Sequence, residues 1–280
     1  MSGEPPPGTL FVVSTPIGHL GDLSHRAIEV LAGAAAILAE DTRHTRHLLD
    51  RYAIATPMRA YHEHNEAQES ERAVARLVQG EALALVSDAG TPLLSDPGAR
   101  LVRAAIDAGA PVSPVPGASA LLAALVGAGL DADRFTFFGF LPRKGADRTT
   151  ALRDIAALGH TAVVYEAPNR VAATLSDLAD AGAGARPAAV ARELTKQFEE
   201  FRRGTVGALA AYYGGSPPKG EVVLVIGGAP PGATMPSEEE LRMRVRELRD
   251  AGTSARDITA ALIDAHGVAR NVAYRLAHEA

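Results

Sequence analysis

Cysteine is absent from the 280-residue chain, and its absence excludes several kinds of chemistry at once. Without thiols there are no disulfides, no zinc–thiolate or iron–sulfur centres and no cysteine nucleophile. The nine histidines have no zinc-ligand spacing such as HExxH, so we expect no metal site. A globally basic coat is missing too, because 28 Lys and Arg face 33 Asp and Glu, for a net charge of −5. Any nucleic acid must therefore be held by a local patch.

Long apolar runs are also missing, and no stretch reaches the ~20 residues that cross a membrane. Residues 1–7 carry Glu4 and three prolines instead of a basic region followed by an apolar core, which argues against a signal peptide. We therefore expect a cytoplasmic protein without membrane contacts. Apolar residues make up 47% and charged residues 22%, which is typical of a folded globular chain, and the length favours two domains with an appendage.

The first part of the chain alternates short apolar runs with longer amphipathic stretches. Continuous apolar runs spaced by helices indicate a parallel sheet that is buried on both faces. We therefore predict an α/β domain over residues 1–117. Its strands are expected at 9–14, 36–39, 82–86 and 112–115, and its helices at about 23–33, 42–52, 66–79 and 99–108.

A second α/β domain with a more mixed sheet is predicted over residues 118–230, followed by a helical extension at 236–280. The domain's strands are expected at 135–138, 161–165, 188–191, 221–226 and, where Phe and Arg alternate, 199–204, with helices at about 149–158, 171–181 and 206–213. The extension's helices are expected at roughly 237–250, 253–265 and 268–278, with Ser237 capping the first and Gly267 ending the second.

Neither GxGxxG nor the Walker pattern occurs in a usable context, so the search for a ligand site turns to the carboxyl ends of the strands. The segment 87–98, directly after a buried strand, holds two Asp, two Ser, one Thr, two Gly and two Pro. A simple turn needs two to six residues, so this is a long loop with its own structure. Its donors and carboxylates suit adenine and ribose-like groups, although a turn with an N-cap at Ser95 or Asp96 is the structural alternative.

Polar residues follow other strands as well, and each group has a structural interpretation. Asp41 is more typical of an N-cap for the helix starting at Thr42 than of a ligand contact. The charged residues at 166–170 and 192–196 are consistent with surface ion pairs. Cations mixed with aromatics at 135–153 and 192–203 suit RNA, but also a core strand followed by a solvated helix face.

In this order, the segments resemble the tetrapyrrole methylase superfamily, and within it the ribosomal RNA small subunit methyltransferase I family. The resemblance covers roughly residues 9–228. The matching stretches are 14–18 with 22–23, 39–43, 87–98, 116–119, 138–142 with Lys144, 165–168 with Arg170, 191–196 and 219–221. His19 stands where the family usually has Asn, and Asn169 where it usually has His; both keep hydrogen-bonding capacity.

The resemblance implies an S-adenosylmethionine-dependent enzyme that methylates the 2′-oxygen of a cytidine in 16S rRNA of the small ribosomal subunit. It also implies two α/β domains with the cofactor in the cleft between them, a homodimer, and a helix-turn-helix-like extension at 236–280. In that extension seven Arg face eight Asp and Glu, so electrostatics gives little support for RNA binding by it. The cofactor contacts that the resemblance implies are Pro16, Ser87, Asp88, Ala89, Gly90, Thr91, Ser95, Asp96, Ser119, Ala120, Tyr165, Glu166, Ala167 and Pro168.

The reaction needs no metal, because a sulfonium methyl is already activated, but a protonated ribose hydroxyl is a poor nucleophile. From the matching motifs, Glu40, Asp41 and Glu166 are candidate bases. Arg43, Arg192 and Lys196 are candidates for steering phosphate or stabilising the developing alkoxide. The structural alternative for each is a salt bridge. The candidate RNA contacts are Arg143, Lys144, Arg148, Arg170, Arg192 and Lys196.

Two other functions stay open at this point. The first is a methyltransferase of the same superfamily that acts on a tetrapyrrole precursor or a modified histidine, against which the motifs at 40–43 and 165–168 weigh. The second is a non-catalytic nucleic-acid-binding regulator that reads DNA through 237–280. The basic recognition face expected of such a module is not evident there.

Overall fold

The computed structural model describes residues 8–230, 238–266, 268 and 270–279, so the expected caps at Ser237 and Gly267 lie outside the described residues. The chain divides into two compact units, Met1–Ala120 and Leu121–Ala280. The three-domain division at 117 and 236 stays a prediction. None of the helices in the described part of the chain is both long and apolar enough to cross a lipid bilayer.

The first unit is built around a five-stranded sheet with the order β3-β2-β4-β1-β5, in which neighbouring strands run parallel. The strands are β1 (Leu10–Val13), β2 (Ala36–Ala39), β3 (Met58–Ala60), β4 (Leu83–Val86) and β5 (Val112–Val115). The helices are α1 (His25–Gly33), α2 (Thr42–Arg51), α3 (Glu66–Val78) and α4 (Ala99–Asp107), with a 3₁₀ turn at Leu20–Asp22. Sequence patterns missed β3, because this edge strand is only three residues long and partly exposed.

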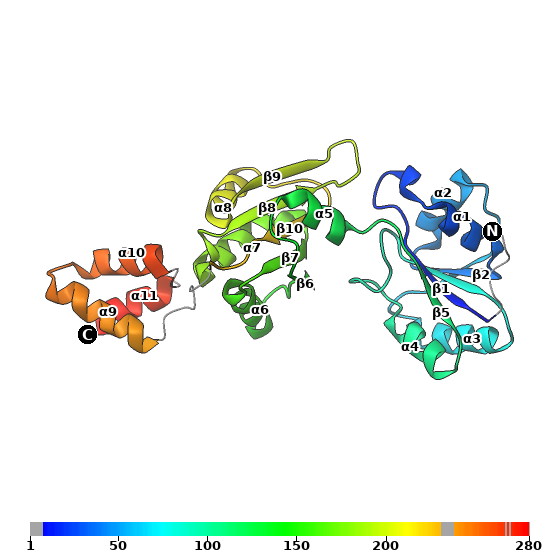
Figure 1. Ribbon diagram of the computed structural model, residues 1–280, viewed down its shortest axis with the longest axis horizontal. Helices are drawn as coiled ribbons and strands as arrows, with labels where there is room; N and C mark the ends of the chain where they lie inside the picture. The colour runs from blue at the N-terminus through cyan, green and yellow to red at the C-terminus, as the bar shows by residue number, and fades with distance from the viewer. Residues whose placement is uncertain (1–7, 231–237, 267, 269, 280) are drawn as a thin grey trace. The chain divides into compact units, whose positions relative to one another are not determined.

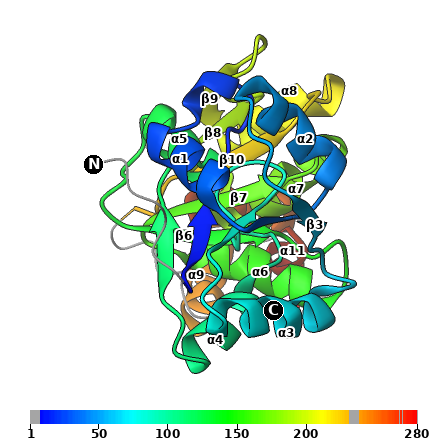
Figure 2. The same cartoon turned by 90° about the vertical axis from the view of Figure 1, so that its right-hand side faces the viewer.

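Alternating side chains bury both faces of this sheet, as its continuous apolar strands predicted. Phe11 and Ile37 pack with α1 and α2, whereas Leu10, Leu38 and Leu85 pack with α3 and α4. Figure 1 and Figure 2 both show α1 and α2 on one side of the sheet and α3 and α4 on the other. The carboxyl ends of the strands are left for the loops that follow them.

The second unit contains a mixed five-stranded sheet with the order β6-β7-β10-β8-β9. β6 and β7 run parallel, and the other neighbouring pairs run antiparallel. The strands are β6 (Phe135–Phe140), β7 (Thr161–Glu166), β8 (Pro187–Arg192), β9 (Glu200–Thr205) and β10 (Val222–Ile226). The helices are α5 (Ala120–Ala128), α6 (Ala146–Ala157), α7 (Val171–Leu178) and α8 (Val206–Gly215), with a 3₁₀ turn at Pro168–Arg170 and a π-helical turn at Ala179–Ala183.

The two faces of the second sheet have different partners. Val164, Val190 and Leu224 pack with α6, α7 and α8. On the opposite face the start of α5 reaches β7, since the backbone N–H of Leu121 donates to the hydroxyl of Tyr165 at 3.1 Å. Successive side chains of β7 therefore point to opposite faces of the sheet and contact different elements.

Three further helices follow: α9 (Glu238–Asp250), α10 (Ala255–His266) and α11 (Arg270–Glu279). They share a small apolar core of their own, which includes Leu241, Val245, Ile258, Leu262 and Leu276. This segment is all-helical, as its sequence pattern indicated.

Candidate functional site

Loops that follow β1, β4 and β5 are tied together at the carboxyl edge of the first sheet. Thr15 and Gly90 exchange two backbone hydrogen bonds of 2.8 and 3.0 Å. The hydroxyls of Ser14 and Thr91 lie 3.0 Å apart, and Thr91 Oγ1 donates to the carbonyl of Ala118 at 3.2 Å. Hydrogen bonds thus join the three segments that sequence motifs singled out separately.

Two glycines allow these loops to approach each other closely. Gly90 has a φ of +79°, and a Cβ there would lie 3.2 Å from Ile17 Cγ2. A Cβ on Gly117 would lie 3.0 Å from Ser14 Cβ. Leu93 and Ser95 add left-handed backbone at φ +74° each, which non-glycine residues adopt at a cost. The 87–98 loop therefore keeps a specific shape, held by its neighbours.

Carboxylates gather at the same edge, because β2 and β4 are adjacent strands. Burial raises the pKa of Glu40, and the nearby carboxylates of Asp96 and Asp88 raise it further. Burial also raises the pKa of Asp96, although a hydrogen bond involving Ser87 partly opposes this shift. Asp88 Oδ1 accepts the backbone N–H of Asp41 at 3.0 Å. The edge is rich in acceptors for hydroxyl and amino groups.

Asp41 has the structural role that its position favoured. It is the N-cap of α2, accepting the backbone N–H of Arg43 at 2.8 Å, and it pairs with the Arg43 guanidinium at 2.8 Å. Hydrogen bonds from Arg43 hold the pKa of Asp41 well below its usual range. Such a carboxylate is a weak proton acceptor.

In the second unit, Tyr165 and Glu166 project to opposite faces of β7. The Tyr165 ring packs edge-to-face against Phe137 and Phe140, with centroids 4.8 and 5.6 Å away. Its hydroxyl accepts the N–H of Leu121, the residue that follows the predicted cofactor contact Ala120. Tyr165 and the start of α5 are therefore brought together.

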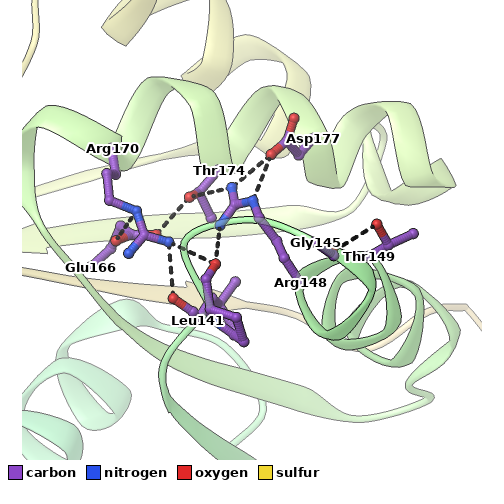
Figure 3. Close-up of polar contacts among 9 residues, drawn as sticks. Leu141, Gly145, Arg148, Thr149, Glu166, Arg170, Thr174 and Asp177 are labelled. Atoms are coloured by element: carbon purple, nitrogen blue, oxygen red, sulfur yellow. Dashed lines mark hydrogen bonds and ion pairs between the residues drawn. The ribbon is translucent and has the colours of Figure 1, made fainter.

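Glu166 lies on the other face, buried against α7. Its carboxylate accepts the Thr174 hydroxyl at 2.6 Å and lies 3.3 Å from Arg170 Nε (Figure 3). It also accepts the backbone N–H of Ala167 at 2.9 Å. Both carboxylate oxygens are therefore engaged by donors of the chain itself. Its assignment as a base stays a prediction that this geometry does not favour.

Arg148 and Arg170 also have partners within the second unit. Arg148 pairs with Asp177 at 2.6 Å, and both guanidiniums donate to the carbonyl of Pro142 at 3.2 Å (Figure 3). Arg170 additionally donates to the carbonyl of Leu141 at 2.9 Å. The two arginines thus hold the segment between β6 and α6 in place.

Arg192 and Lys196 are engaged in the same way at the end of β8. Arg192 pairs with Glu200 at 2.7 Å, and Lys196 pairs with Glu193 at 3.1 Å and Glu221 at 2.9 Å. Arg143 and Lys144 differ from these four cations, because both are exposed. Four of the six predicted RNA contacts are therefore engaged in ion pairs within the described part of the second unit, and two are not.

Sequence reasoning missed three residues that shape this edge. Ser14 and Thr15 were noted only as parts of a motif, yet they bind Thr91 and, through Thr15 Oγ1, the carbonyl of Ser87 at 3.3 Å. Glu66, at the start of α3, accepts the N–H of Gly98 at 3.2 Å and so anchors the end of the long loop. A hydroxyl pair directly after β1 was a usable signal for the first two, whereas Glu66 had none.

Comparison with known proteins identifies the architecture. The family model of Tetrapyrrole (Corrin/Porphyrin) Methylases matches residues 9–210. The chain belongs to the tetrapyrrole methylase family. A solved member of the same fold, uroporphyrin-III C-methyltransferase from Thermus thermophilus complexed with S-adenosyl homocysteine, aligns with a TM-score of 0.56 at 20% identity. That alignment covers 78% of this chain and 96% of the other.

Comparison with curated relatives shows which group of tetrapyrrole methylases this chain is similar to. A protein named ribosomal RNA small subunit methyltransferase I from Synechocystis is 45% identical over 97% of this chain and 98% of its own length. One of the same name from Xylella fastidiosa is 52% identical over 80% of this chain and 82% of its own length. The resemblance and the α/β fold expected from the sequence are confirmed, and the chain is a methyltransferase.

Proposed function

We propose that this methyltransferase transfers the methyl group of S-adenosylmethionine to the 2′-oxygen of a cytidine ribose in 16S rRNA of the small ribosomal subunit. The observation that carries the proposal is the identity of 45% to a relative named as an rRNA methyltransferase over nearly the whole of both chains. The tied loops of the first unit support it, because they include most of the cofactor contacts that the motifs implied.

The residues at the carboxyl edge of the first sheet fit the cofactor. S-adenosylmethionine supplies a methyl group on a positively charged sulfur and carries an adenosine with two ribose hydroxyls. Asp88 and Asp96 offer acceptors for hydroxyl or amino groups. Gly90 lets the loop lie close to Ile17, since a side chain at this position would crowd it. The gathered carboxylates also favour a cation nearby. Pro16, Ser87–Thr91, Ser95–Asp96 and Ser119–Ala120 would hold the cofactor in the first unit, and 165–168 in the second.

Among the three candidate bases, Glu40 fits the role best. A general base works most efficiently when its pKa lies near the working pH, and burial together with Asp96 and Asp88 moves the pKa of Glu40 in that direction. Asp41 is paired with Arg43, and both carboxylate oxygens of Glu166 are engaged by Thr174, Ala167 and Arg170. We assign Glu40 to accept the proton of the ribose hydroxyl and the other two to positioning.

The cations of the candidate site fall into two groups, those with exposed side chains and those already engaged by other groups of the chain. The Arg43 side chain is 90% exposed even while paired with Asp41, so it can meet an RNA phosphate without leaving that partner. Arg143 and Lys144 are exposed as well. Arg148, Arg170, Arg192 and Lys196 are already engaged and shape the surface rather than touch RNA. RNA steering therefore depends on a few local cations, as the negative net charge requires.

A homodimer and a cytoplasmic location complete the proposal. Helix α5 carries Leu122 and Val126 one turn apart, 50% and 75% exposed, which favours contact with a second apolar surface. Light scattering of the purified protein should give twice the mass of one chain, and a monomer at micromolar concentration would contradict the dimer. Cell fractionation should find the protein with ribosomal subunits in the cytoplasm.

The central test is methyl transfer to 16S rRNA that lacks the modification. We expect label from methyl-labelled cofactor to appear on the ribose of one cytidine, located by nuclease digestion and mass mapping. Naked rRNA, assembled small subunits and a tetrapyrrole precursor serve as parallel substrates. Label on the precursor alone, or on an RNA base instead of a ribose, would refute the proposal.

A further inference from the structure

A β-bulge in β6 reverses the alternation of its side chains. The strand keeps its register with β7 as far as Phe137, which lies opposite Val163, but the next pair is Phe140 opposite Tyr165. One extra residue is therefore inserted, and Gly139 absorbs it with a φ of +61°. Bulges are over-represented at sheet edges, where β6 lies, and next to active sites, where they redirect a side chain.

The bulge moves Phe140 from one face of the sheet to the other. Phe138, just before it, packs against the core beneath α6, α7 and α8. Regular alternation would place Phe140 on that same face. Instead its ring lies beside Tyr165 and is 57% exposed. A large aromatic side chain is thus turned outward next to a residue of the candidate cofactor site.

The chain that follows Phe140 is fixed in place. As Figure 3 shows, Arg170 reaches Leu141 from the 3₁₀ turn before α7, and Arg148 on α6 lies between Thr174 and Asp177. Their side chains are only 21% and 11% exposed. Two mostly buried guanidiniums thus secure the two carbonyls directly after Phe140. The ring is therefore presented by a rigid segment and loses little freedom when a ligand binds.

Two exposed cations come next in the sequence. Arg143 and Lys144 follow the clamped carbonyls, and within the described ranges no carboxylate lies at ion-pair distance from either. An outward aromatic ring with positive charges three and four residues away matches an unpaired base flanked by phosphates. An apolar ligand would leave the two cations without a partner, and the bases of a duplex are paired and stacked, so they are not free to stack on the ring.

We propose that Phe140 stacks on an unpaired base of the substrate RNA while Arg143 and Lys144 bind the adjoining phosphates. The inference rests on the proposed function and adds a binding residue to it. Arg148 and Arg170 act as positioning residues for this contact. The bulge at Gly139 is the backbone feature that makes the contact available.

The experiment compares Phe140→Leu with Phe140→Trp in the full-length protein. We measure dissociation constants for unmodified 16S rRNA and, separately, for S-adenosylmethionine. Stacking on an aromatic ring changes RNA affinity by ~5- to 150-fold, so Phe140→Leu should weaken RNA binding by that factor, whereas Phe140→Trp should stay within about threefold of wild type. Cofactor affinity should change by less than about threefold in both. Thermal melts establish that each variant is folded.

Two further variants serve as controls. Phe135→Leu removes a ring that is 38% exposed at the other end of the same strand, and RNA affinity should stay within about twofold of wild type. Arg143→Gln with Lys144→Gln should weaken RNA binding and reduce the slope of log affinity against log salt by ~0.7 for each phosphate that is no longer bound.

The outcomes separate this inference from the proposed function. If wild type methylates 16S rRNA but Phe140→Leu binds RNA as wild type does, only the stacking contact is refuted. If Phe140→Leu loses cofactor affinity with unchanged RNA affinity, the ring serves the cofactor. A change of oligomeric state with unchanged RNA affinity would assign the ring to a protein contact. If wild type does not methylate rRNA, the proposed function itself fails.

Discussion

Neighbouring carboxylates in this protein have opposite environments. Glu40 is partly buried beside Asp88 and Asp96, which raises its pKa, whereas hydrogen bonds from Arg43 lower the pKa of Asp41. The difference arises because Glu40 directly follows β2 and lies near Asp88 and Asp96 of the loop after β4, whereas Asp41 caps α2. We therefore expect Glu40 to accept the proton and Asp41 to have a structural role.

Replacing Glu40 with Gln should lower kcat by about 10²–10⁴-fold while the affinity for S-adenosylmethionine stays within a few-fold. A base must be deprotonated, so the raised pKa of Glu40 should place the acid limb of the pH–rate profile above ~4.3, the value of an ordinary glutamate. Single-turnover rates over a pH series check this, with Asp41→Asn as the control, since Asn caps a helix nearly as well. Full turnover in Glu40→Gln would contradict the assignment.

We expect Asp96 to lower the folding stability at neutral pH while contributing to cofactor binding. Burial raises its folded-state pKa, so its contribution to stability is present below the unfolded value of ~3.9 and is lost as pH rises through the raised folded value. Asp96→Asn should therefore raise Tm by a few degrees at neutral pH, show little gain near pH 4, and weaken cofactor binding. Melts at both pH values test this against Asp107→Asn, an exposed control; equal Tm changes in the two variants would refute it.

At the level of single elements, β7 supplies side chains for two purposes. Tyr165 points to the face where α5 begins, and Glu166 points to α7, where Thr174 and Arg170 surround it. Neighbouring residues of one strand thus separate a candidate ligand contact from a structural anchor. The anchor extends through Arg148 and fixes the segment after β6.

Thr174→Val should destabilise the second unit by about 1–3 kcal/mol. The substitution keeps the side-chain shape but removes a hydroxyl that donates to the buried Glu166 at 2.6 Å and accepts from Arg148 at 3.1 Å. Thr149→Val is the matched control, because the exposed Thr149 hydroxyl bonds only weakly at 3.4 Å to the carbonyl of Gly145 (Figure 3). Urea unfolding should show a change of less than about 0.5 kcal/mol for the control. Equal losses in both variants would contradict the anchor.

For the molecule as a whole, charge is the main constraint on RNA binding. The net charge of −5 leaves binding to local cations, and α9–α11 provide no surplus, since seven Arg face eight acidic residues there. Their apolar core, centred on Leu241, Ile258 and Leu276, is also separate from the cores of the two sheets. We therefore expect that the rest of the chain folds without α9–α11 and that these helices contribute little to the electrostatic attraction of RNA.

A chain ending at residue 230 should keep the Tm of the main transition within about 2 °C and weaken RNA binding by less than about threefold. In both forms, methylation at low RNA concentration should fall as salt rises, because phosphate contacts release counterions. Calorimetry and rates across a salt series measure these effects. A drop in RNA affinity above tenfold would show that α9–α11 read the RNA by contacts that net charge does not reveal.

Most secondary structure was readable from local patterns. The strands at 36–39 and 112–115 occur with the expected bounds. The run at 36–39 is buried throughout, and such a continuous apolar run is a property of consecutive residues. The short β3 and the bulge at Gly139 were not readable, since both depend on pairing with β2 and β7. The motif residues likewise marked which loops matter without showing how the loops meet.

What folding alone decided is the partner of a charged side chain where that partner is distant in the sequence. Arg148 and Lys196 were candidate RNA contacts, and packing pairs them with Asp177 and Glu221. Burial of an apolar face follows from spacing along the chain, whereas these ion pairs depend on which distant segments the fold makes adjacent. For that reason composition and motifs were enough to place this chain among the methyltransferases, while the choice of Glu40 over Glu166 as base required the folded arrangement.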